Sequence, residues 1–273
     1  MKVAVLLFGH LRTFEYCAPY LKKNFLDKYD CDVFIHTWNT MDSETKSWDN
    51  KKSQHCPVTE AIKAKIKKIY NPRKILIEEQ VIKEEILVHS LVDDKSASLA
   101  GIHFMFESMN KANLLRKEYE KEKGISYDIV LVTRPDVAFF RVLELEKTLN
   151  EAQILNLNID KCRFFAGLYG SSETNVRLLL SRVSDILFFA KPHVIDTYIA
   201  SNLDISKGYA NNHFLNVVSI YASNEIKAGI LPIEICFACE KDWKNLKEIP
   251  VSVVKKHSKL YKFFHCYWLR GKK

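Results

Sequence analysis

Three short segments with charged, polar or glycine residues each follow an apolar run. TRPD (133–136) comes directly after YDIVLV, GHLR (9–12) follows VAVLLF, and TWN (37–39) lies at the end of CDVFIHTW. Glycine permits a tight turn, arginine binds phosphate, an aromatic ring can stack on a base, and a carboxylate binds a metal ion or a sugar hydroxyl. Together these residue types suit a nucleoside diphosphate. The candidate ligand-binding residues are Gly9, His10, Arg12, Thr37, Trp38, Arg134 and Asp136.

Simpler explanations exist for some of these residues. Arg134 and Asp136 could form a salt bridge that only closes the end of a strand. Trp38 could simply pack, as aromatic residues at strand ends usually do. The chain has neither the G-x-G-x-x-G fingerprint nor the Walker lysine motif, so neither a dinucleotide-binding turn nor a P-loop is predicted.

Apolar runs alternate with amphipathic segments through the first half of the chain. Strands are expected over residues 3–8, 31–38, 74–79 and 127–133, and helices over 15–29, 58–70 and 96–124. This alternation predicts an α/β protein with a Rossmann-like, mostly parallel central sheet flanked by helices. Ligands of such sheets bind outside the carboxyl ends of the strands. The three polar segments should therefore converge on one edge.

The second half has a different pattern. Apolar runs over 161–170 and 184–192 predict strands, helical spacing is found over 193–203 and 211–230, and a last strand is expected near 231–237. We expect more antiparallel strands here. The expected organisation is one catalytic domain over 1–254, with a nucleotide-binding half (1–140), an acceptor-side half (141–254) and a separate tail (255–273).

Two residues of the second half are candidate catalytic groups. Asp185 stands at the entrance to an apolar strand, where a carboxylate could act as a general base or orient a sugar, and the alternative is a helix or strand cap. His213 follows two asparagines and is a second candidate base, although most such histidines pack or face solvent.

Positive charge is concentrated at the C-terminus. Residues 255–273 hold seven of the 41 basic residues and none of the 33 acidic ones, so the rest of the chain has a net charge of only +1. Aromatic residues are interleaved with these cations. The tail is expected to form a basic aromatic helix that either binds an anionic membrane surface or packs on the domain. Nucleic-acid binding is not expected, because no basic stripe or known motif lies elsewhere.

The location of the chain is predicted from its apolar runs. The N-terminal run VAVLLF is six residues long and is followed by His10 and Arg12, which favours a buried strand over a signal peptide. No apolar run approaches the roughly 18 residues of a membrane span. A cytoplasmic protein is expected, peripheral to the inner face of the inner membrane if the tail binds lipid. Seven scattered cysteines do not suggest a disulfide framework. The C-x-x-C at Cys236 and Cys239 is expected to consist of buried core thiols, and a metal or redox role is the less favoured alternative.

The chain resembles bacterial glycosyltransferases of the GT-A type found in O-antigen, capsule and lipooligosaccharide biosynthesis clusters. The resemblance rests on FGHLRTF, CDVFIHTWN and a long helix running into YDIVLVTRPDVAFF, with weaker matches in SDILFFAKPHVIDTY and NNHFLNVVSIYASNEIKAGI. It covers most of residues 1–235. It implies a GT-A fold, a nucleoside diphosphate sugar as donor, and a glycan or lipid-linked oligosaccharide as acceptor.

The resemblance also implies residue roles. Gly9 and Arg12 match the nucleotide-side loop, Asp185 matches an aspartate of a later strand, and Asp136 matches the last acid of the D-x-D motif that binds Mg²⁺ or Mn²⁺. The chain departs from the pattern twice: His10 stands where glutamine is more usual, and Arg134 occupies the first acidic position. A guanidinium cannot bind a cation but could contact a donor phosphate.

The resulting hypothesis is glycosyl transfer. Two rivals remain open at this stage: a nucleotidyl or phosphoryl transferase acting on capsule sugars, and a non-catalytic membrane-associated scaffold of the same pathway.

Overall fold

The computed structural model describes residues 1–42, 56–81, 99–139, 142–154, 159–168, 187–203 and 227–237. The predicted residues Asp185 and His213, and the whole basic tail, lie outside these ranges. None of the helices in these ranges has the length and hydropathy needed to cross a membrane.

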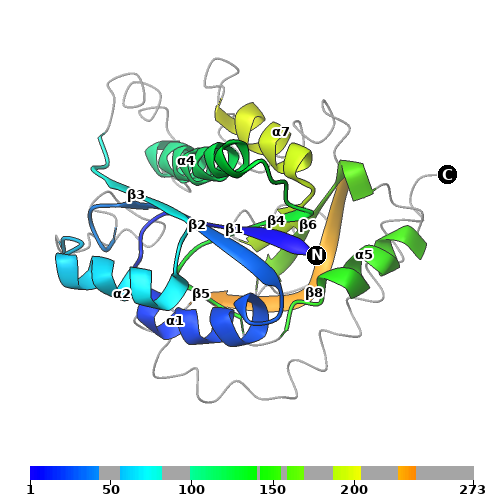
Figure 1. Cartoon of the computed structure of the whole chain (residues 1–273), viewed down its shortest axis with the longest axis horizontal. Helices are drawn as coiled ribbons and strands as arrows, with labels where there is room; N and C mark the ends of the chain where they lie inside the picture. The colour runs from blue at the N-terminus through cyan, green and yellow to red at the C-terminus, as the bar shows by residue number, and fades with distance from the viewer. Residues whose placement is uncertain are drawn as a thin grey trace.

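A mixed, eight-stranded sheet with the order β3-β2-β1-β4-β7-β6-β8-β5 forms the centre of the α/β fold (Figure 1). Its first four members pair in parallel, as the alternation of strands and helices predicts. These are β1 (Lys2–Phe8), β2 (Asp30–Trp38), β3 (Lys74–Glu78) and β4 (Ile129–Thr133). The carboxyl ends of all four strands therefore lie at the same edge of the sheet.

The remaining strands are of mixed direction. β7 (Leu187–Ala190) is antiparallel to both β4 and β6 (Cys162–Leu168). β8 (Lys227–Phe237) pairs in parallel with β6 and antiparallel with the short β5 (Val137–Ala138). The expectation of antiparallel strands in the second half is confirmed for three of these pairs, while β6 and β8 are parallel.

Helices cover both faces of the sheet (Figure 1). α4 (Leu99–Lys123) and α7 (Pro192–Leu203) lie on one face, whereas α1 (Phe14–Leu21) and α2 (Glu60–Tyr70) lie on the other. A π-helical turn (Lys22–Leu26) continues α1, and α5 (Leu145–Ile154) leads to a 3-10 turn (Ile159–Lys161).

The strand sequences are apolar on both sides because both faces are covered. Along β1, Val3, Val5 and Leu7 belong to the core cluster under α1 and α2. The alternate residues of the same strand, among them Leu6 and Phe8, belong to the cluster under α4 and α7. Side chains of successive strand residues point to opposite faces, so a single run of apolar residues fills two cores.

One predicted helix is shorter than expected, and four residues of another belong to a strand. The helix predicted over 15–29 ends its regular part at Leu21, and the π-helical turn stops at Leu26. The helix predicted over 211–230 is wrong over its last four residues, because Lys227–Ile230 belong to β8 and pair with β6. Residues 211–226 lie outside the described ranges. Gly229 weakens a helix, and the sheet offers this segment backbone partners that a helix end would not. The division into domains stays a prediction.

A buried arginine ties the two helices of one face together. The side chain of Arg116 on α4 is 1% exposed and donates to Asp196 of α7 at 2.6 Å and to Glu120 at 2.6 Å. Asn113 donates to the same Asp196 at 2.7 Å. Because each charge has a partner, the group can be buried; removing one partner would leave the others uncompensated.

The Arg116→Ala variant should lose about 2–4 kcal/mol of the free energy of unfolding, because a fully buried side chain is replaced by a cavity, and Glu120 (18% exposed) and Asp196 (32% exposed) lose its guanidinium group. Urea denaturation measures this loss. The matched control is Lys117→Ala. Lys117 lies 3.8 Å from the same Asp196 but is 51% exposed, so its removal should cost less than about 1 kcal/mol. Equal losses in the two variants would contradict the assignment.

Candidate functional site

The loops that follow β1, β2 and β4 meet at the carboxyl edge of the sheet. The backbone N–H of Arg12 donates to the carbonyl of Met41 at 2.8 Å, and the Arg12 side chain reaches both Asp42 and Asp136. Three of the four parallel strands thus deliver residues to one place. We call Arg12, Asp42, Arg134 and Asp136 the arginine–aspartate cluster.

Arg12 has an unusual backbone conformation within this cluster. Its φ angle is 43°, in the left-handed region that residues with a side chain seldom occupy. Its Nε donates to Asp42 Oδ1 at 2.5 Å and its Nη1 to Asp136 Oδ2 at 3.2 Å. A left-handed non-glycine residue costs on the order of 1–3 kcal/mol, and such residues gather at functional sites. In this strained conformation the guanidinium group of Arg12 contacts Asp136.

Asp136 is the buried centre of the cluster. Its side chain is 6% exposed, and Arg134 forms a bidentate salt bridge with it. The Arg134 Nε donates to Oδ1 at 2.8 Å, and Nη2 donates to Oδ2. Burial raises the pKa of Asp136 to about 6, against the opposing effect of Arg12. The carboxylate is therefore mostly ionised at neutral pH and holds two guanidinium groups side by side. The salt-bridged strand end considered from the sequence is present.

These contacts do not fit Asp136 as a metal ligand. Both of its oxygens accept from guanidinium groups, and two nearby positive charges would repel a divalent cation. Within the described ranges, no three histidine, cysteine, aspartate or glutamate side chains are grouped so that they could hold a metal ion. The role of Mg²⁺ or Mn²⁺ stays a prediction that the geometry at Asp136 does not support.

His10 lies beside the cluster and is 7% exposed. Its Nδ1 is 3.1 Å from the carbonyl oxygen of Thr40. Burial lowers the pKa of His10 to about 4, although the carbonyl of Thr40 opposes this effect, so the ring is neutral near pH 7. The adjacent Gly9 has a φ angle of 86°, which glycine adopts without strain and which turns the chain at the end of β1.

Thr37 and Trp38 are both buried at the end of β2. The Thr37 hydroxyl donates to the Trp38 carbonyl at 3.4 Å. The Trp38 ring is packed edge to face against His36 and Phe104, with centroids 4.7 and 5.5 Å away, and the ammonium of Lys111 lies 5.4 Å from the ring centre. The indole therefore packs in this structure and does not offer an open surface for a base.

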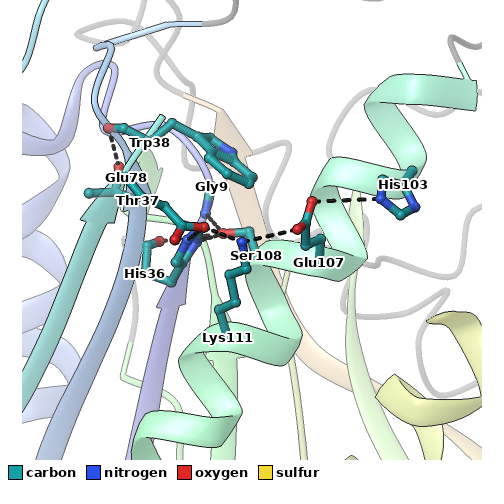
Figure 2. Close-up of polar contacts among 9 residues, drawn as sticks. All are labelled: Gly9, His36, Thr37, Trp38, Glu78, His103, Glu107, Ser108 and Lys111. Carbon is teal, nitrogen blue, oxygen red and sulfur yellow. Dashed lines mark hydrogen bonds and ion pairs between the residues drawn. The ribbon is translucent and has the colours of Figure 1, made fainter. Parts of the chain in front are cut away.

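A second polar network joins Gly9 to α4 (Figure 2). The Gly9 N–H donates to Ser108 Oγ at 2.7 Å, and Ser108 Oγ lies 2.6 Å from His36 Nδ1. His36 Nε2 lies 3.2 Å from Glu78, which also accepts from Lys111. The network continues from Lys111 to Glu107 at 3.0 Å and from Glu107 to His103 at 3.6 Å.

The protons of this network can be assigned. A carboxylate only accepts, so His36 Nε2 carries the proton and Nδ1 accepts from the Ser108 hydroxyl, which in turn accepts from Gly9. Burial lowers the pKa of His36 to about 4, and Glu78 only partly offsets this. Burial alone would raise the pKa of Glu78, but Lys111 and His36 lower it. From Gly9 to Glu78, each N–H or O–H group that links the network has an acceptor, and these bonds fix the glycine turn from behind.

A cleft of about 160 Å³ lies at the opposite end of β2. Its lining includes Cys31, Tyr70 and Arg73. The Arg73 Nε donates to Asp32 at 2.5 Å, and burial raises the pKa of the Cys31 thiol to about 12, which leaves the thiol unreactive. The cleft is thus separate from the arginine–aspartate cluster and offers no comparable chemistry.

Comparisons with known proteins add little. No family model matches the chain, and no curated protein matches it. Among solved structures, it is similar to the nucleoside-diphosphate-sugar pyrophosphorylase from Vibrio cholerae RC9, with a TM-score of 0.46 and 8% identity over 90% of this chain and 98% of that one. A likeness at this level carries no argument about the reaction.

The pH dependence of stability should reveal the neutral His36. Its pKa is about 4 when folded and about 6.5 when unfolded, so the unfolded chain binds more protons between these values. The contribution of His36 is complete above pH 6.5 and is lost as the pH falls toward 4, by up to about 1.4 kcal/mol per pH unit.

Urea denaturation of the wild type and of His36→Asn between pH 4 and 8 measures this effect. The asparagine retains an acceptor for Ser108 but does not titrate, so the variant should show a shallower pH dependence. Parallel curves for the two proteins would contradict a neutral, buried His36.

Proposed function

We propose that this chain transfers a sugar from a nucleoside diphosphate sugar to a hydroxyl group of a bacterial surface glycan or lipid-linked oligosaccharide. The observation that supports the proposal most is the pair of guanidinium groups, Arg12 and Arg134, held on the buried Asp136 at the carboxyl edge of the sheet. This is the edge at which open α/β sheets bind their ligands.

The two arginines would act on the leaving group. In the transfer, the bond between the anomeric carbon and the diphosphate oxygen breaks, and the acceptor oxygen bonds to that carbon. The hydroxyl proton passes to a base, and the nucleoside diphosphate leaves with the bonding electrons. Guanidinium groups that are already in place stabilise the growing charge on the diphosphate without reorganisation. A guanidinium has five N–H donors, so contact with a carboxylate is compatible with contact to phosphate.

Asp136 would position both arginines. Its carboxylate keeps two like charges close together before the ligand arrives, which lowers the cost of assembling the phosphate site. The left-handed Arg12 serves the same purpose. No step of the reaction is assigned to a metal ion, because the described contacts of Asp136 do not suit one.

The base that accepts the proton of the acceptor hydroxyl group is proposed from the sequence alone. Asp185 is the first candidate and His213 the second, and both are outside the described residues. The basic tail over 255–273 is likewise proposed to bind an anionic membrane surface, which would bring the enzyme to a lipid-linked acceptor.

A nucleotidyl or phosphoryl transferase is the second candidate function. The same guanidinium pair would suit the triphosphate of a nucleotide, since arginine recognises phosphate groups in either ligand. A thermal-shift panel of nucleotide sugars, nucleoside diphosphates and nucleoside triphosphates, with and without Mn²⁺, distinguishes the two. Release of nucleoside diphosphate from a nucleotide sugar supports glycosyl transfer, and selective binding of triphosphates supports the second candidate.

Replacing either arginine of the cluster should weaken nucleotide binding. The Arg12→Gln and Arg134→Gln variants each lose a charged hydrogen-bond donor, for which about 10- to 100-fold higher Kd is expected. Calorimetric titration with the nucleoside diphosphate that stabilises the wild type measures the change. The matched control is Arg73→Gln, which removes an arginine paired with Asp32 at the other edge of the sheet. Wild-type affinity in both cluster variants, or an equal loss in the control, would refute the assignment.

A further inference from the structure

The loop over residues 9–12 is held in place from two sides. Behind it, the Gly9 N–H donates to Ser108 of α4 (Figure 2). In front, the side chain of His10 bonds to the Thr40 carbonyl at 3.1 Å, and the Arg12 N–H bonds to the Met41 carbonyl at 2.8 Å. The position of the His10 ring is therefore set by the protein before any ligand binds.

The bond to Thr40 determines which nitrogen of His10 carries the proton. A carbonyl oxygen can only accept, so the proton of this bond is on Nδ1. Since burial lowers the pKa of His10 to about 4, the neutral ring has no second proton. Nε2 consequently presents a lone pair and needs a donor.

No residue in the described part of the chain donates to this lone pair. His10 Nε2 is buried without a hydrogen-bond partner. Leaving a buried acceptor unsatisfied is unfavourable, and each such atom in a folded protein calls for an explanation. The atom belongs to the loop that the proposed function assigns to the nucleotide sugar, so the missing donor can come from that ligand.

The chemistry of Nε2 restricts what that donor can be. A phosphate oxygen is itself an acceptor at neutral pH and cannot satisfy the lone pair. The nearby charges are those of Arg12, Asp42 and Asp136, and the proposed function assigns the guanidinium groups to the diphosphate. In a nucleoside diphosphate sugar, the groups attached on either side of the diphosphate are the ribose and the transferred sugar. Both carry hydroxyl groups.

We propose that Nε2 of His10 accepts a hydrogen bond from a hydroxyl group of the bound nucleotide sugar, either on the ribose or on the transferred sugar. This inference rests on the proposed function. It makes His10 a residue that selects hydroxylated ligands over their deoxy analogues. No proton is transferred, since the ring only accepts the bond.

The test compares matched ligands on matched variants by calorimetric titration. The ligands are the nucleoside diphosphate that binds the wild type, its 2′-deoxy and 3′-deoxy analogues, and the corresponding nucleotide sugar with a deoxygenated counterpart. His10→Phe keeps a ring but removes the acceptor. His10→Gln has an amide that can donate to Thr40 and accept from the ligand, so it should restore selectivity.

For the wild type, removal of the correct hydroxyl should raise Kd about tenfold, because the lone pair again lacks a donor. His10→Phe should bind the hydroxylated and deoxy ligands equally, and His10→Gln should distinguish them. Selectivity for a deoxyribose ligand identifies the ribose as the source, whereas selectivity confined to the nucleotide sugars identifies the transferred sugar.

Three results would overturn the inference. Equal binding of all analogues by the wild type would do so, as would unchanged selectivity in His10→Phe. If the wild type binds nucleoside diphosphates and this binding depends on Arg12, either of these two results refutes only the role of His10 and leaves the proposed function standing. If no nucleoside diphosphate or nucleotide sugar binds, the proposed function fails and the role of His10 fails with it.

Discussion

A single buried carboxylate connects the parts of the candidate site. Asp136 follows β4, Arg12 follows β1, and Arg12 in turn contacts Asp42 in the loop after β2. An ionised carboxylate is costly to bury alone, so two guanidinium groups must stay close to it. That requirement holds three loops at fixed positions and accounts for the left-handed backbone of Arg12. The same pair of positive charges makes this edge attractive to a diphosphate.

A second set of contacts supports the first without sharing any side chain with it. Ser108 and His36 hold the amide of Gly9 from the side of α4. Glu78 at the end of β3 and Lys111 in the middle of α4 complete the hydrogen bonds. The turn after β1 is therefore clamped between a helix behind it and the Thr40–Asp42 loop in front. Such a clamp reduces the entropy that a flexible loop would lose when it binds a ligand.

Much of the sheet could be predicted from sequence, because strands covered on both faces appear as unbroken apolar runs. The relative direction of the later strands could not be predicted from sequence. β6 and β8 pair across more than sixty residues, and no local sequence pattern determines whether such a pair is parallel or antiparallel. The meeting of the loops followed from the rule for parallel strands. The two partners of Asp136 differ in how far the sequence predicts them. Arg134 is two residues away, and its spacing suggests a salt bridge, whereas the contact with Arg12 spans 124 residues and has no local signal.

The residues that sequence reasoning missed look like ordinary core or helix residues. His36 lies inside the apolar run CDVFIHTW, and Ser108 lies in the middle of a long helix. A polar residue in a run of buried positions is the signal that could have found them, because it must have a partner. Conversely, the sequence predicts that Trp38 could stack on a base at the carboxyl edge of the sheet, but in the structure His36 and Phe104 pack against its ring.

The order of the strands also has a consequence for how the chain folds. β1 lies between β2 and β4, and Val3 pairs with Ile129. During synthesis the first strand leaves the ribosome long before its second neighbour exists, so one of its edges stays without backbone partners until β4 is made. Contacts between residues this far apart in sequence slow folding and leave an apolar edge open to association with other chains. The sheet that builds the site is therefore closed late, by the strand that also carries Arg134 and Asp136 at its end.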